Sequence, residues 1–123
     1  MTRANLKDLT VAQMVERFAA MGVEQDHALL WDENAKFTRL YWQMDAIKKE
    51  LKSRPGDQRR ALLVLFDHLN MQVRVKAAKA TLAVAPEAAR RMLQAIADSR
   101  RQPQAGDAGM CLRNLDRGVF VPD

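Results

Sequence analysis

The sequence is poor in cysteine, glycine and proline: its 123 residues include one, five and four of them, respectively. Because Cys111 is alone, it can form no disulfide within the chain, and such cysteine usage is typical of the reducing cytoplasm. The longest uninterrupted apolar run, 61–66, is far shorter than the about 20 residues of a membrane span. Residues 1–10 lack the apolar core of a secretion signal. We therefore expect one globular, cytoplasmic domain over residues 1–123.

Residues that would carry catalysis or hold a metal are also scarce. The two histidines, His27 and His68, have no metal-type spacing to each other or to Cys111. The pair Gly106 and Gly109 lacks the preceding strand and the spacing of a phosphate loop, so we interpret it as a turn that starts a helix. The sequence therefore predicts no enzyme, no metal and no cofactor. His68 is interpreted as a residue that bonds the last carbonyls of a helix.

The charge of the chain, a formal net +5, is concentrated in its middle. Residues 1–47 hold five Lys or Arg against seven Asp or Glu, a net charge of −2. Residues 48–101 hold thirteen against five, a net of +8, and residues 102–123 hold two against three, a net of −1. Such a basic segment would attract nucleic acid or an acidic partner, although basic residues on helices often only solvate a surface.

Apolar residues at helical spacing predict two long helices in the first half of the chain. Thr10 and Gln13 have the spacing of a capping box, so the first helix should begin there and run toward Leu30. Asp32 or Asn34 is expected to cap the second helix. The second helix has the strongest apolar stripe of the chain, which comprises Phe37, Leu40, Tyr41, Met44, Ile47 and Leu51.

The second half of the chain predicts shorter helices. Asp57 is expected to cap a buried helix through the run 61–66, although periodicity alone does not exclude a buried strand there. Asn70 is expected to cap a helix with two apolar, alanine-rich faces, which predicts close packing on both sides. Helices over about 88–97 and 107–115 complete the chain.

A faint internal repeat accompanies these helices: Leu62-x-x-Leu65-x-Asp67 recurs 31 residues later as Leu93-x-x-Ile96-x-Asp98. Repeated helical hairpins bury their apolar faces by stacking on one another. The segment 57–85 also resembles a single repeat of the HEAT/armadillo superfamily. That resemblance rests on a leucine-rich first helix, a polar turn over 67–72, and Val73-Arg74 followed by Ala77 and Ala80.

Two positions depart from that repeat: Leu69 stands where a turn proline is common, and Thr81 where a core leucine is usual, a role that Leu82 can fill. The whole chain, from Leu9 into residues 103–110, is similar to a small bacterial family known only as a domain of unknown function with an armadillo-like fold. These resemblances imply an all-α, right-handed α-α superhelix of about three stacked helical hairpins. They imply no activity and no catalytic residues.

The resemblance also implies a role for Arg74, because the equivalent arginine of such repeats commonly pairs with a turn aspartate, here Asp67 or Asp98. Second helices of such repeats line a concave surface, where Arg74, Lys76 and Lys79 would form a cationic groove for phosphates or carboxylates. The alternative is that these residues only solubilise an otherwise apolar helix.

Aromatic residues gather at the start of the second helix. Tyr41 belongs to the apolar stripe, so we expect it in the core. Trp42 lies one position off the stripe, where burial in the core is the commoner outcome. An exposed Trp42 beside Arg39 would instead have the composition of an interface anchor.

We therefore predict a non-enzymatic protein–protein interaction module, such as an adaptor, inhibitor or immunity-type partner. Its partner-binding candidates are Arg39, Trp42, Arg74, Lys76 and Lys79. The alternative hypothesis is binding of nucleic acid or an acidic partner through the basic 48–101 surface. A second copy of the chain is a further candidate partner, because the stripe of the second helix needs cover.

Overall fold

The computed structural model describes residues 3–123, with side chains from Leu6 onward, and every regular element in that range is a helix. Two compact units divide the chain: unit 1 is Met1–Ala61 and unit 2 is Leu62–Asp123. The elements are the 3₁₀ helices η1 (Arg3–Asp8) and η2 (Gln58–Asp67) and the α-helices α1 (Val11–Leu30), α2 (Asn34–Ser53), α3 (Met71–Ala80), α4 (Pro86–Asp98) and α5 (Gln104–Asp116). The all-α prediction is confirmed; the superhelical stacking of hairpins stays a prediction.

The start of α1 confirms the predicted capping box. The Gln13 amide donates to Thr10 Oγ1 at 3.1 Å, and the Thr10 amide donates to Gln13 Oε1 at 2.9 Å. These reciprocal bonds satisfy donors that a helix end otherwise leaves free. The helix then continues through buried Gly22 to Leu30.

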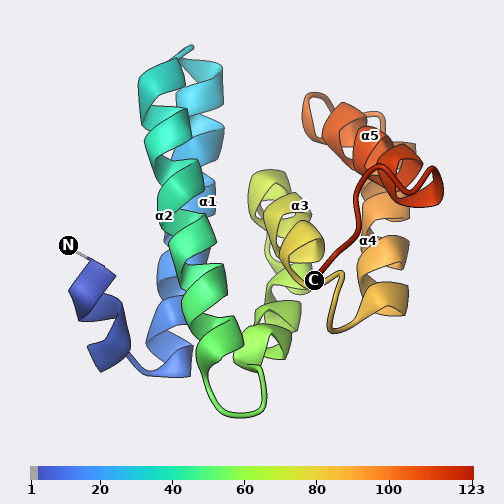
Figure 1. Cartoon of the computed structure of the whole chain (residues 1–123). Coiled ribbons are helices and arrows are strands. Elements are labelled where there is room, and N and C mark those ends of the chain that lie inside the picture. Colours follow the sequence, from blue (N-terminus) through green and yellow to red (C-terminus); the bar gives the residue numbers. More distant parts are fainter. Residues whose placement is uncertain (1–2) are drawn as a thin grey trace. The chain divides into compact units, whose positions relative to one another are not determined.

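Unit 1 is built on the side-by-side pair of α1 and α2 (Figure 1). Its fully buried side chains are large: Met14 and Phe18 of α1, and Met44, Ile47 and Leu51 of α2. Burial of several such side chains, each contributing about 1.5–3 kcal/mol, stabilises the pair.

The connection between α1 and α2 differs from the prediction. Neither Asp32 nor Asn34 caps α2; the cap position is Glu33, which makes no side-chain capping bond. Asp32 instead adopts φ 56°, a left-handed conformation that Asp tolerates better than most residues. This turn lets the Glu33 amide donate to the Ala28 carbonyl at 2.8 Å and reverses the chain.

Arg54 fixes the end of α2 to the N-terminal segment. Its Nε donates to Glu50 at 2.8 Å, while Nη2 donates to the carbonyls of Leu6 and Leu9 at 3.0 and 2.9 Å. Charge-assisted bonds of this kind are stronger than neutral ones. One basic residue of the 48–101 segment therefore has a structural role.

The apolar run 61–66 forms part of η2 rather than the predicted buried α-helix. A 3₁₀ helix has three residues per turn, so every third side chain faces the same way. Arg59, Leu62 and Leu65 follow that spacing and are 5%, 0% and 7% exposed. Val64, off that row, is 65% exposed, which corrects the expectation that the run is buried all round.

Unit 2 contains α3, α4 and α5, which pack mutually (Figure 1). Asn70 caps α3 as predicted, with Oδ1 accepting from the Gln72 and Val73 amides at 2.9 and 3.2 Å. The core consists of Val75, Ala78, Leu82, Ala89, Leu93, Ile96, Ala108 and Cys111. Its alanines allow the close approach that the two apolar faces predicted.

Of two further expectations in unit 2, one is wrong and one is confirmed. Helix α5 begins at Gln104, so Gly106 and Gly109 lie inside the helix and the predicted helix-start turn is wrong. Thr81 is fully buried, and its hydroxyl donates to the Ala77 carbonyl at 2.9 Å. Leu82 takes the core position beside it, as expected.

Among residues 3–123, no helix is both long and apolar enough to cross a membrane.

Candidate functional site

The exposed face of α2 carries an aromatic pair. Tyr41 is 41% exposed, so the expectation that it lies in the core is wrong. Trp42 is 57% exposed, so it too lies at the surface rather than in the core, which was the commoner outcome. The buried residues Leu40, Met44 and Ile47 define the side of α2 that meets α1. Because each residue turns a helix by about 100°, Tyr41 and Trp42 point progressively away from that side.

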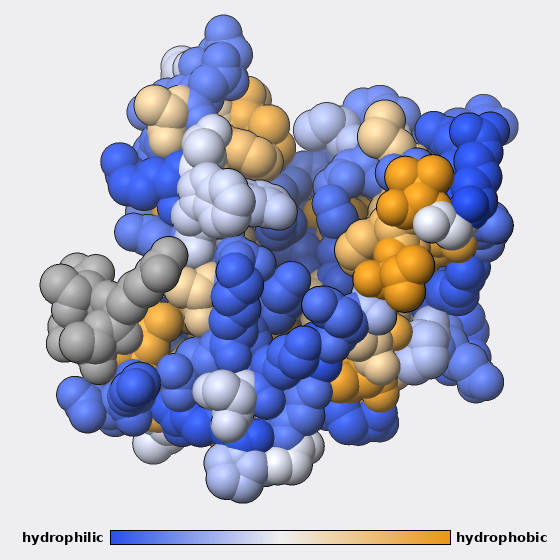
Figure 2. All heavy atoms as spheres, viewed as in Figure 1, coloured by the Kyte–Doolittle hydropathy of each residue, from blue (hydrophilic) through white to orange (hydrophobic). Residues whose placement is uncertain are grey.

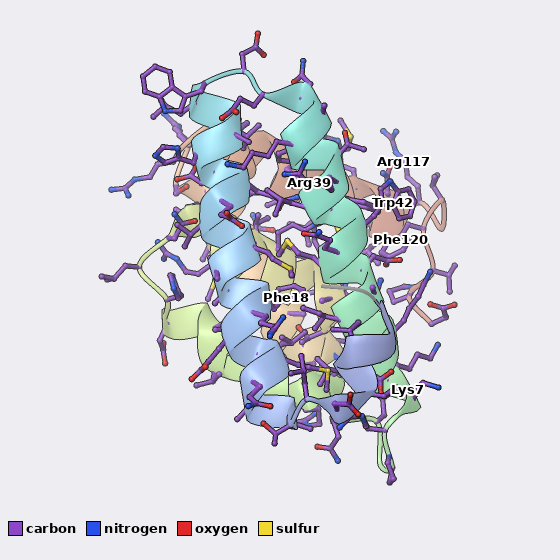
Figure 3. All side chains as sticks on the ribbon, turned by 90° about the vertical axis from the view of Figure 1, so that its left-hand side faces the viewer. Lys7, Phe18, Arg39, Trp42, Arg117 and Phe120 are labelled. Atoms are coloured by element: carbon purple, nitrogen blue, oxygen red, sulfur yellow. The ribbon has the colours of Figure 1, made fainter. Side chains whose placement is uncertain are left out.

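The two rings form a defined surface. Their centroids are 5.0 Å apart at an interplanar angle of 89°, an edge-to-face contact of the kind aromatic pairs favour. Arg39 is exposed one turn before Trp42 on α2 (Figure 3). We define the α2 surface as the exposed Arg39, Tyr41 and Trp42 together with the half-buried Lys36. Residues 34–44 contain no Asp or Glu.

Asp45 closes the α2 surface at its C-terminal side. It accepts from Lys49 Nζ at 2.9 Å and contacts Lys48 Nζ at 3.4 Å. Partial burial opposes ionisation, but the hydrogen bond from Lys49 and the charges of both lysines outweigh it and hold the pKa of Asp45 below its usual range. The carboxylate of Asp45 is thus neutralised by Lys48 and Lys49. Arg39, three residues before Trp42, is the cation nearest to Trp42 along the helix.

The three cations of α3 do not form a common groove of free charges. Lys79 pairs with Asp107 of α5 at 3.0 Å, and Lys76 is half-buried. Arg74 donates weakly from Nη2 to the Leu69 carbonyl at 3.5 Å, and its buried Nε has no partner among the described residues. The implied ion pair of Arg74 with Asp67 or Asp98 is absent from the ion pairs of the described chain.

Ion pairs also break up the basic 48–101 segment. At least six of its thirteen Lys and Arg residues are bonded to carboxylates: Lys48, Lys49, Arg54, Arg59, Lys79 and Arg90. Arg59, the most buried, makes a forked contact with Asp57 at 2.9 and 2.6 Å. That side-chain hydrogen bond lowers the pKa of Asp57. The +8 of this segment is therefore shared between two units and partly neutralised in each.

Unit 2 contains a hollow that the sequence did not predict. It has a volume of about 340 Å³ and is lined by Leu82, Pro86, Arg90, Leu115, Phe120 and Val121, among others. Val119, Phe120 and Val121 are exposed beside it, and Figure 2 shows hydrophobic surface over the C-terminal part of unit 2. Its one charged lining residue, Arg90, is occupied by Asp116 at 3.1 Å. The only sequence signal was the apolar triplet 119–121.

The described residues contain no group of three His, Cys, Asp or Glu side chains placed to hold a metal ion. His68 accepts from the Asn70 amide through Nδ1 at 3.0 Å, so it supports the turn before α3 rather than the last carbonyls of a helix. Cys111 is buried in the core of unit 2, and burial raises the pKa of its thiol. His68 and Cys111 therefore lie where they support the fold: His68 in the turn before α3 and Cys111 in the core of unit 2.

Comparisons with known proteins add a family and a fold. A family model described as a domain of unknown function, DUF2019, matches residues 12–116. The crystal structure of the protein RPA1889 from Rhodopseudomonas palustris CGA009 is similar to this chain at 56% sequence identity and a TM-score of 0.92, over 94% of this chain and 95% of that one. Comparison with curated proteins gave no match.

Proposed function

We propose that this chain, which belongs to the DUF2019 family of domains of unknown function, is a non-enzymatic protein-interaction module. Its partner contacts the α2 surface, with Trp42 as the apolar anchor and Arg39 as the charged one. The small helical hairpins and the single, buried cysteine are consistent with a HEAT-like binding protein of the cytoplasm, acting as an adaptor, inhibitor or immunity-type partner.

The observation that carries this proposal is the exposure of the Tyr41–Trp42 pair. A tryptophan that is 57% exposed keeps much of a large apolar ring in water, which is unfavourable at about 25 cal/mol for each Å² of apolar surface. Trp, Tyr and Arg are the residues most enriched among those that dominate binding energy. Here all three occur within four positions of one rigid helix.

The charge of the α2 surface indicates the chemistry of its partner. Lys36 and Arg39 stand in a stretch, residues 34–44, without a carboxylate. A partner that presents an acidic side chain beside an apolar one would therefore be attracted and would bury Trp42 at the same time.

Capture from the native host tests the proposal. Tagged full-length chain should retain a stoichiometric protein at physiological salt, and Trp42→Ser or Arg39→Glu should each reduce its recovery at least about tenfold. Arg91→Glu, a reversal at an exposed position of α4, is the matched control and should leave recovery unchanged. Recovery at background level, or equal recovery with all variants, would contradict the proposal.

Nucleic-acid binding through residues 48–101 is tested by titrating a labelled duplex and a labelled single strand at low salt. A protein that contacts several phosphates binds in this regime and loses affinity steeply as salt rises. Because at least six of the thirteen cations are paired within the chain, we expect no binding that competes with the protein partner. Tight, salt-dependent binding would favour the nucleic-acid function instead.

A further inference from the structure

We infer that the α2 surface is occupied by a second copy of this chain, whose acidic hairpin tip docks on it while its own α2 surface receives the tip of the first. The inference rests on the proposed function, because it names the partner of the same surface. It is carried by a second exposed apolar feature of unit 1 with the opposite charge.

That feature is the hairpin tip, residues 23–33, where α1 ends and the chain turns into α2. Leu30 and Trp31 are 75% and 66% exposed there, and Val23 and Leu29 are about two-fifths exposed, at 40% and 38%. The hairpin end combines hydrophobic with hydrophilic surface in Figure 2. Such a group of large apolar side chains at the end of a hairpin is typical of a contact surface.

The hairpin tip is acidic throughout. It contains Glu24, Asp26, Asp32 and Glu33, all exposed, and no Lys or Arg occurs between residues 18 and 35. Its formal charge is thus −4, whereas the next eleven residues, 34–44, carry +2. Two consecutive segments of equal length therefore present exposed tryptophans in fields of opposite sign.

Most of the charges on these two segments form no ion pair within the described chain. No ion pair of the described residues includes Glu24, Asp32, Glu33, Lys36 or Arg39. The tip leads directly into the rigid α2, so Glu33 cannot fold back onto Trp42, about 14 Å further along the helix. A second molecule can reach both segments at once.

Two-fold symmetry makes the match reciprocal. If α2 of one copy lies antiparallel to α2 of the other, each acidic tip lies opposite a basic α2 surface, and the contact forms twice. Given their exposure, Trp31 and Trp42 together bury about 300 Å² on each copy, a substantial part of the about 800 Å² per partner in a typical stable interface. One occupant thus covers both exposed aromatic features and neutralises both charged segments.

Sedimentation of the purified full-length chain over about 1 to 200 µM tests the inference, since this range covers micromolar dissociation constants. We expect a monomer–dimer equilibrium that weakens as salt rises, and tryptophan emission that shifts to shorter wavelength as the dimer forms. A wild-type chain that stays monomeric at the highest concentration and low salt would overturn the inference.

Charge-reversal variants test whether opposite charges hold the dimer together. Lys36→Glu/Arg39→Glu and Glu24→Lys/Asp26→Lys/Glu33→Lys, which turns the formal charge of the tip from −4 to +2, should each weaken dimerisation at least about tenfold, because like charges then meet in both halves of the contact. An equimolar mixture of the two variants should recover the dimer, since every contact then joins opposite charges. Arg91→Glu is the control, and circular dichroism checks that each variant is folded.

The outcomes separate this inference from the proposed function. A dimer that is indifferent to these reversals, or variants that fail to complement each other, would overturn the inference. A monomeric wild-type chain that still captures a host protein in a Trp42-dependent way would overturn only the second-copy occupant and leave the interaction function standing. A monomer without any such capture would contradict both.

Discussion

The helices of the two units are held together by different kinds of side chain. Unit 1 joins two 20-residue helices through large buried side chains such as Phe18 and Ile47. Unit 2 joins helices of 10 to 13 residues through a core in which alanines alternate with larger residues such as Leu93 and Ile96. It also ties α3 to α5 with polar contacts, Lys79–Asp107 and Gln72–Gln104. Both units expose large apolar side chains, but both tryptophans lie on the surface of unit 1, whereas Gln72 and Lys79 of α3 are bonded to α5 within unit 2.

Opposite core substitutions should have the largest effects on this comparison. Ile47→Ala in unit 1 leaves a cavity and should cost about 2–5 kcal/mol of unfolding free energy. Ala78→Leu in unit 2 overfills a close-packed site and should cost about 1–3 kcal/mol. Both positions are fully buried. Urea unfolding, with hydrogen exchange read separately for α2 and α4, measures each loss.

Exposed positions supply the controls for this pair. Gln43→Ala on α2 and Arg91→Ala on α4 should each stay within about 0.5 kcal/mol of the wild type. A neutral Ala78→Leu would mean that the alanine-rich faces of α3 are not closely packed, and the contrast between the units would disappear.

Two arginines extend the comparison to polar structure. Arg54→Met removes the bonds to Glu50, Leu6 and Leu9 and should cost about 2 kcal/mol, with faster exchange in η1. Arg74→Met removes one 3.5 Å bond and a buried donor that has no partner among residues 3–123. It should change stability by less than about 1 kcal/mol, because the lost bond and the relieved buried donor offset each other.

Thermal unfolding of the two arginine variants side by side decides this prediction. Equal losses would show that Arg74 has the structural partner that the repeat resemblance implies, and would place its role in stacking rather than at a free surface.

Buried glutamines separate the units on a smaller scale. Gln104 donates to Gln72 at 2.9 Å, and both are nearly fully buried. Gln72→Leu leaves a buried amide unsatisfied and should cost about 1–2 kcal/mol, part of which Gln72→Leu/Gln104→Leu should restore. Gln25 of unit 1 donates to the Phe37 carbonyl at 3.4 Å, a longer and weaker bond than the 2.9 Å bond of Gln104 to Gln72. Gln25→Leu should therefore cost less unfolding free energy than Gln72→Leu. A larger loss for Gln25→Leu would mean that buried polar bonds stabilise unit 1 more than unit 2.

Local signals explain what could be predicted from the sequence. The Thr10–Gln13 box and the Asn70 cap act within three residues, so the pattern alone located the starts of α1 and α3. The run 61–66 has no apolar period, and nothing local separates a 3₁₀ helix from an α-helix; the three-residue row of Leu62 and Leu65 becomes visible only in the folded chain.

The candidate site was harder to predict because exposure depends on tertiary context. Tyr41 follows Phe37 by four residues and therefore joined the apolar stripe, yet in the folded chain the buried row of α2 is Leu40, Met44, Ile47 and Leu51. The pairing of Lys79 with Asp107 spans 28 residues, a separation at which sequence gives no register between helices. Exposure of Trp42 and the loss of a cationic groove on α3 both follow from such long-range packing.

Acid should produce the smallest difference between the units, and it should appear in unit 1. The carboxyls of Asp45 and Asp57, both in unit 1, have pKa values below their usual range because lysines and Arg59, respectively, bond their charged forms. A depressed folded-state pKa means that the unfolded chain binds more protons in acid, so this stabilisation is complete above about pH 4 and is lost as pH falls through the folded values. Asp45→Asn/Asp57→Asn should flatten the fall in unit 1 stability below pH 4, whereas Gln43→Asn should leave it unchanged. Hydrogen exchange of α2 against α4 across this range measures it, and an equal acid response in both helices would show that these two carboxylates do not set the difference.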